Sequence, residues 1–231
     1  MKKILLACLM VGLCVSNMNF VSATLSTDIN IGNHEIESYS DLKYLSERLD
    51  DFILKNPSSS EEEQDTFLNE VIQSSEFEMQ KSMNRSAGDY LPGYNNLNSQ
   101  EKKLAKQSPT KAVSVYSCAS TATNKTISIY GRNGYQDNTD AFRHGYWNIL
   151  MVKKIGKSWA EKWANAHEYT SSGVDKEMDL RNNKIGRDSY VSGKSDSQLS
   201  SIIVSKVNTG KMWRIIGGQL TKTSGGRNYE N

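Results

Sequence analysis

The chain has 231 residues and a mass of 25.9 kDa, which is enough for one sizeable domain or two small ones. Hydrophobic residues make up 37% of the sequence, charged residues 23%, and there are 3 prolines, a composition that excludes a collagen, a low-complexity polymer and a multi-span membrane protein. The formal net charge of +2 is too small to point to any one class of partner.

The N-terminal segment, residues 1–23, has the pattern of a secretory signal peptide. Lys2 and Lys3 precede an apolar run at residues 4–15, and residues 20–23 predict cleavage after Ala23. We therefore expect a secreted protein, extracellular or in the cell envelope, with no membrane span after cleavage. Cleavage would remove two of the three cysteines and leave Cys118 alone, which excludes an intramolecular disulfide in the mature chain.

Charge is distributed unevenly along the rest of the chain. Residues 24–80 contain 14 acidic and 3 basic residues, whereas residues 81–231 contain 23 basic and 12 acidic ones. Two solvated faces would explain this split. Alternatively, the basic part meets an anionic surface such as phospholipid, wall polymer or nucleic acid, with the acidic part docked on it in cis. No specific nucleic-acid motif is present.

Residues 24–85 are predicted to form an acidic N-terminal helical segment. One helix opens at Ser40 and ends at Asn56, and a second opens at residues 58–63, where three serines and three glutamates suit the positive end of a helix. We expect the two helices to pack as a hairpin. The expected core face of the second helix consists of Phe67, Leu68, Val71, Ile72, Met79 and Met83.

Residues 86–97 are the predicted linker, because they contain two glycines and a proline. A basic helical domain is expected to follow at residues 98–231, opening with a capping box at Asn98. Its further helices are predicted at residues 109–127, 139–154, 158–169, 175–190 and 198–207, before a turn and an irregular end or short hairpin. The predicted fold class is mainly α: a helical bundle-like domain preceded by an N-terminal helical hairpin.

Three successive predicted helices place polar residues on faces that would otherwise be core. The residues that share these faces are Asp140, His144, Asn148, His167, Asp179, Asn182 and Asn183. Burying such groups is costly unless they bond to one another, to a metal or to a ligand. A structural network that locks three helices, an active site, and a binding pocket without chemistry all fit this pattern.

Two mechanisms fit an active site here. In the first, His144 is a general base oriented by Asp179, and His167 or Glu168 is the partner acid. In the second, His144, His167 and a carboxylate bind a divalent metal that activates water. The cofactor is otherwise unknown. The residues predicted to bind an anionic substrate are Arg143, Asn183 and Arg187.

The same region resembles a bacterial domain family of unknown function. Its members carry Ala-Phe-Arg-His-x-x-Trp-Asn, then Ala-His-Glu, then Met-Asp-Leu-x-Asn-Asn-x-x-Gly-Arg, which stand here at residues 141–148, 166–168 and 178–187. The resemblance covers about residues 98–216. It implies a helical domain of exported, sometimes toxin-like, proteins. The positions that it marks for testing are Arg143, His144, His167, Glu168, Asp179, Asn183 and Arg187. It implies no particular reaction.

We therefore expect a secreted bacterial hydrolase that acts on an anionic substrate, such as a phosphodiester or an envelope component. One alternative is a non-enzymatic module that binds an envelope polymer or a partner protein, with a purely structural His/Asp/Asn network. Another is a toxin-like effector masked by its acidic N-terminal part.

Overall fold

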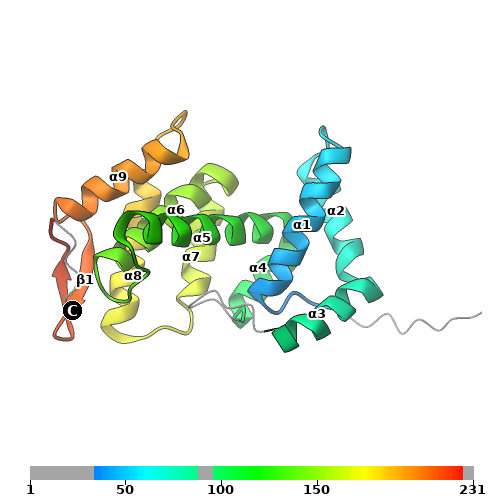
Figure 1. Cartoon of the computed structure of the whole chain (residues 1–231), viewed down its shortest axis with the longest axis horizontal. Coiled ribbons are helices and arrows are strands. Elements are labelled where there is room, and N and C mark those ends of the chain that lie inside the picture. Colours follow the sequence, from blue (N-terminus) through cyan, green and yellow to red (C-terminus); the bar gives the residue numbers. More distant parts are fainter. Residues whose placement is uncertain (1–33, 88–95, 226–231) are drawn as a thin grey trace, which may run out of the picture. The chain divides into compact units, whose positions relative to one another are not determined.

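The computed structural model describes residues 34–87 and 96–225, all of which belong to one compact unit (Figure 1). The predicted signal peptide at residues 1–23 and most of the predicted linker at residues 86–97 lie outside the described residues. In the part described, the chain is mainly α, as the sequence predicted. The elements are α1 (Tyr39–Lys55), α2 (Glu61–Ile72), α3 (Ser75–Ala87), α4 (Ser99–Gln107), α5 (Pro109–Tyr130), α6 (Asn138–Ile155), α7 (Lys157–His167), α8 (Gly173–Asp188), α9 (Asp196–Asn208), β1 (Trp213–Ile216) and β2 (Gln219–Lys222).

The N-terminal segment contains three helices, so the prediction of a two-helix hairpin was too simple. The predicted second helix is interrupted at Gln73, and Ser74 Oγ accepts a hydrogen bond from the amide of Phe77 to begin α3. This break turns Phe77 into the core and leaves Met79 and Met83 64% and 54% exposed. The apolar spacing continues across the break that the Ser74 cap creates, so the sequence pattern predicts one helix where the structure has two.

The acidic segment is fastened to the start of α5. Asp65 Oδ1 accepts hydrogen bonds from the Ser108 hydroxyl at 3.2 Å and from the Thr110 amide at 2.8 Å. Glu61 pairs with Lys111 beside this contact. Because an acid at a helix N-terminus is favoured by the free amides there, Asp65 fixes α2 against α5.

Helix α6 is the central helix of the unit and packs against α5, α7, α8 and α9. The Asp137 side chain caps it by accepting from the amides of Thr139 and Asp140. Nearly every residue from Asn138 to Val152 is buried, which is typical of a helix enclosed on all sides. A Cβ added at Gly186 of α8 would stand 2.3 Å from the carbonyl oxygen of Gly145, so only glycine permits this close helix crossing.

The chain ends in an antiparallel hairpin of β1 and β2, in the register Trp213 with Lys222 and Ile216 with Gln219. Asn182 of α8 joins this hairpin to the helices, since its amide donates to the Trp213 carbonyl at 2.9 Å and its Oδ1 accepts from the Trp213 amide at 3.0 Å. Figure 1 shows the hairpin at the end of the chain, next to α8 and α9. The sequence had allowed a short hairpin or an irregular end here.

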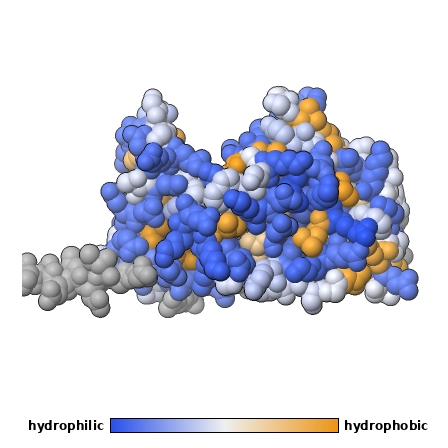
Figure 2. All heavy atoms as spheres, turned by 180° about the vertical axis from the view of Figure 1, so that it is seen from behind, coloured by the Kyte–Doolittle hydropathy of each residue, from blue (hydrophilic) through white to orange (hydrophobic). Residues whose placement is uncertain are grey.

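One face of the unit is largely polar. Figure 2 shows one face on which hydrophilic side chains predominate and hydrophobic ones stand in small separate groups. Across the described residues, no helix combines the length and the apolar character that crossing a bilayer would require.

Candidate functional site

His144 stands at the centre of a buried polar cluster between α6 and α8. Asp140 lies one turn earlier on α6, and Asp179 comes from α8. The Nε2 atom of His144 is 3.4 Å from an oxygen of Asp140 and 3.4 Å from an oxygen of Asp179. A short charge-assisted hydrogen bond would measure about 2.7–2.9 Å, so Nε2 faces both carboxylates without being drawn fully to either.

A chain of amides fixes which nitrogen of His144 carries a proton. The Arg187 guanidinium donates to Asn148 Oδ1 at 2.9 Å, which turns the Asn148 amide nitrogen toward Asn183 Oδ1 at 2.7 Å. The Asn183 oxygen therefore acts as an acceptor, and it lies 3.1 Å from His144 Nδ1. Nδ1 must carry the proton of that bond, which leaves Nε2 as the atom whose state can change.

Glu168 approaches the imidazole from the end of α7. Its Oε1 lies 3.9 Å from His144 Nδ1 and accepts from the Asn183 amide at 3.4 Å, while Oε2 accepts from the Ser171 hydroxyl at 2.9 Å. Three helices thus each bring a carboxylate to His144: α6 through Asp140, α7 through Glu168 and α8 through Asp179.

Asp140 is itself held from outside the cluster. Its second oxygen accepts from the Gln136 amide at 2.6 Å, and its first oxygen accepts from the Arg143 guanidinium. Arg143 also donates to Asn133 Oδ1 at 2.6 Å and to the Gly134 carbonyl at 3.0 Å. The loop before α6 therefore orients Asp140 toward Nε2 and brings a guanidinium beside it.

The pKa values of three side chains in the cluster differ clearly from those of the free side chains. Burial disfavours the imidazolium, but the carboxylates of Asp179, Asp140 and Glu168 outweigh it and raise the pKa of His144 to about 10. Burial raises the pKa of Asp179 to about 8, and the carboxylates of Asp140 and Glu168 act in the same direction. Although burial opposes it, the charges of Arg143 and His144 hold the pKa of Asp140 below its usual range.

The cluster is almost fully enclosed by protein. The side chains of Asn148 and Asn183 belong to residues with 0% exposure, whereas the Arg143 side chain is 12% exposed and that of Asp179 9%. On the amide side the Arg187 side chain is 5% exposed and contacts the exposed Glu161, so both edges of the cluster come close to the surface.

The structure places the seven predicted site residues in different surroundings. His144, Asp179, Glu168 and Asn183 meet in the cluster. Arg143 stands beside Asp140, and Arg187 contacts Asn148 and Glu161 on the amide side. His167 is paired with Glu101 of α4 through Nδ1 at 2.9 Å, and its ring packs edge-on against Trp147 at 5.2 Å.

Asp140 and Asn148 are the cluster members that the predicted site lacked. Both had been placed on the His144 face of the helix, four residues before and after it, and this spacing is the signal that identifies them. Glu101 completes the capping box that the sequence predicts at Asn98, and the structure gives it two further partners. Its partners, the Tyr39 hydroxyl at 3.3 Å and His167, are 62 and 66 residues away in the chain, so no local pattern could indicate them.

The metal set proposed from sequence is not the one that the structure brings together. Within residues 34–87 and 96–225, the group of potential ligands whose donor atoms all lie within 4.8 Å of one another is Asp140, His144 and Asp179. The interpretation that joined His144 and His167 in one metal site was wrong because the paired imidazole of His167 is directed to Glu101.

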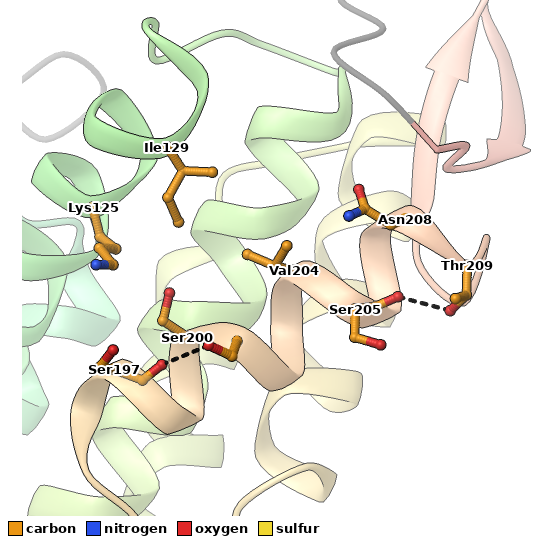
Figure 3. A pocket seen from close by; sticks show the side chains of 9 residues that line it. Lys125, Ile129, Ser197, Ser200, Val204, Ser205, Asn208 and Thr209 are labelled. Carbon is orange, nitrogen blue, oxygen red and sulfur yellow. Dashed lines mark hydrogen bonds between the residues drawn. The ribbon is translucent and has the colours of Figure 1, made fainter.

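A separate groove of about 580 Å³ runs between α5 and α9 (Figure 3). Its lining consists of Lys125, Ile129, Ser197, Ser200, Ser201, Val204, Ser205, Asn208 and Thr209. Two of its hydroxyls are engaged by the α9 backbone, since Thr209 donates to the Ser205 carbonyl and Ser201 to that of Ser197. Lys125 is the one ionisable side chain in this lining, so the groove has no pair of acid and base groups like that around His144.

Comparison with known proteins concerns the same part of the chain. Residues 102–211 match a family model described as Domain of unknown function (DUF6973). All seven predicted site residues and the complete helices α5 to α9 fall within the match. No curated protein and no solved structure matches the chain. The prediction of an uncharacterised domain family is thereby confirmed for this segment.

Proposed function

We propose that the protein is an exported bacterial hydrolase that acts on an anionic ester, with its catalytic centre at the Nε2 edge of His144. The observation that carries this proposal is the buried imidazole held among the carboxylates of Asp140, Glu168 and Asp179. Export itself rests on the predicted signal peptide, and the bacterial context rests on the resemblance described above.

Hydrolysis requires a group that exchanges a proton near the working pH. Free Asp and His side chains titrate at 3.8 and 6.5, but in this cluster the pKa of Asp179 is raised to about 8 and that of His144 to about 10. A simple general-base role for a neutral His144 therefore does not suit the metal-free cluster. In the metal-free chain we therefore assign the exchangeable proton to the Asp179–His144 pair as a unit, and displaced pKa values of this kind are typical of functional sites.

The substrate class follows from Arg143. Its guanidinium is held by Asp140, Asn133 and Gly134, so it is preorganised beside the carboxylate that faces His144 Nε2. A guanidinium that is already oriented favours phosphate or carboxylate. Arg187 and Asn183 act differently, because they position the imidazole through the amide chain that ends at Nδ1. A phosphodiester is the substrate that these features favour.

The test is an activity screen of the full chain against a phosphodiester, a phosphomonoester, a phospholipid analogue and an envelope polymer. Wild-type protein is compared with His144→Gln, and His34→Gln serves as a matched control because it removes an imidazole that pairs with Glu78. We expect turnover of one substrate, a loss of at least about 100-fold in His144→Gln, and no change in His34→Gln.

Two results would contradict this proposal. One is a folded wild-type protein that turns over no member of the screen but binds an anionic polymer in a salt-dependent way, which would favour the binding module. The other is unchanged turnover in a folded His144→Gln variant, which would leave the His144 cluster as a structural network.

A further inference from the structure

We propose that Asp140, His144 and Asp179 together bind one divalent metal ion that prefers tetrahedral coordination, such as Zn²⁺. This inference deepens the proposed function and rests on the same centre. The three residues offer one nitrogen and two carboxylate oxygens, all within 4.8 Å of one another.

The orientation of the imidazole is the first argument. Asn183 Oδ1 engages Nδ1, so the proton at Nδ1 is fixed and Nε2 points to Asp140 and Asp179. If Nε2 were bare, its lone pair would face two carboxylates, an arrangement that requires a positive charge between them. Either a proton or a metal ion supplies that charge. An imidazole whose other nitrogen donates to a fixed oxygen is the usual form of a metal-binding histidine.

The distances from His144 Nε2 to the two carboxylates favour a metal ion over a shared proton. Both Nε2–carboxylate distances are 3.4 Å. Two ligands about 2.0–2.2 Å from a zinc ion at tetrahedral angles stand roughly 3.3–3.6 Å apart. Octahedral coordination at magnesium, with ligands at about 2.0–2.1 Å, would bring neighbouring ligands to roughly 3 Å. The observed spacing is longer than that and longer than a charge-assisted hydrogen bond.

Asp179 provides a second, independent observation. Its side chain is 9% exposed, and its Oδ1, the oxygen that faces Nε2, has no hydrogen-bond partner among the described residues. A buried carboxylate oxygen without such a partner is costly, whereas a metal ion would satisfy it. Burial also raises the pKa of this carboxyl to about 8, which a bound cation would reverse.

The surroundings complete the site. The Gln136 amide holds Asp140 at its outer oxygen, and Asn183 holds His144, so two of the three ligands have fixed supports. Three protein ligands leave a fourth tetrahedral position free, which distinguishes catalytic from structural zinc sites. Arg143 pairs with Asp140, one of the three ligands, so a guanidinium is available beside the site for the anionic group of a substrate.

The test measures metal binding independently of activity. The full chain is stripped with a chelator, titrated with Zn²⁺ by calorimetry, and analysed for zinc after gel filtration. We expect one Zn²⁺ per chain, an affinity at least about 100-fold weaker in Asp179→Asn, and a 10- to 100-fold weaker one in Asn183→Leu. Asp188→Asn, which removes an exposed acid from the same helix, should bind zinc as the wild type does.

X-ray absorption at the zinc edge of the loaded wild-type protein gives a second readout that needs no variant. We expect one imidazole nitrogen together with oxygen ligands. Two imidazoles or a thiolate would overturn the proposal, as would a folded wild-type chain that retains no zinc or an Asp179→Asn variant that binds it as tightly. Zinc binding without turnover would count against the hydrolase alone, whereas chelator-resistant turnover by a zinc-free chain would count against the metal alone.

Discussion

The Nε2 atom of His144 lies 3.4 Å from Oδ1 of Asp179, and both side chains are more than 90% buried. In the metal-free chain this relationship links two titrations. The pKa of His144 is raised from 6.5 to about 10 by its carboxylate neighbours in spite of burial, and that of Asp179 from 3.8 to about 8 by burial. Both groups therefore hold their protons more tightly in the folded chain than in the unfolded chain.

The first prediction is that metal-free protein loses stability as the pH rises from 6.5 to 8. The stabilisation from His144 is complete below about pH 6.5 and is lost as the pH rises through about 10, while the cost of ionising buried Asp179 accumulates between about pH 4 and pH 8. The two effects overlap between pH 6.5 and pH 8, where the free energy of unfolding should fall by up to about 2 kcal/mol per pH unit.

Urea unfolding in the presence of a chelator at pH 6.5, 7.2 and 8.0 measures this slope. Asp179→Asn should flatten it, because the variant lacks one of the two titrating groups. A wild-type chain whose stability is constant across this range, or an equal slope in the variant, would argue against the linked titration.

A second prediction concerns the crossing of α6 and α8. Gly186→Ala should destabilise the fold by about 3 kcal/mol, because the new Cβ would stand 2.3 Å from the Gly145 carbonyl oxygen, which belongs to the backbone and cannot move aside cheaply. Lys184→Ala, two residues earlier and 72% exposed, should change the stability by less than about 0.5 kcal/mol. Equal stabilities of the two variants in chemical denaturation would refute the close crossing.

The third prediction concerns the pair formed by His167 and Glu101. Glu101 is buried and also accepts from the Tyr39 hydroxyl, so it connects α1, α4 and α7. A double-mutant cycle of His167→Gln and Glu101→Gln should give a coupling energy of about 1–2 kcal/mol. Additive effects on the free energy of unfolding would show that the 2.9 Å contact contributes nothing specific.

The helices of the basic part could be predicted because their signals are local. Ser108 followed by Pro109 marks the start of α5, and Gly131, with a φ of 77°, ends it in the left-handed conformation that favours glycine. The sequence pattern does not predict the division between α2 and α3, because apolar residues keep their helical spacing across it. The division depends on one hydroxyl, that of Ser74, which caps α3.

The site was predicted in part, for a physical reason. Helical spacing places Asp140, His144 and Asn148 on one face, and the buried face of α8 adds Asp179 and Asn183. Which groups then meet depends on how helices cross. The sequence groups His167 with His144 because both are histidines on inner helix faces. In the structure, α4 packs close to α7, and His167 pairs with Glu101 instead. Residue spacing within one helix cannot predict such a contact between helices.

Stability and turnover measured together in Asp179→Asn decide whether the His144 cluster serves chemistry or only structure. In chelator-treated, metal-free protein the variant removes a buried carboxylate that is costly to ionise, so we expect Tm to rise by about 3–6 °C at pH 8, given that each kcal/mol moves Tm by about 2–4 °C in a chain of this size. Turnover of the substrate found in the screen should fall at least about 100-fold, with Asp188→Asn unchanged in both. Wild-type turnover in a folded, stabilised Asp179→Asn protein would contradict a catalytic centre at His144.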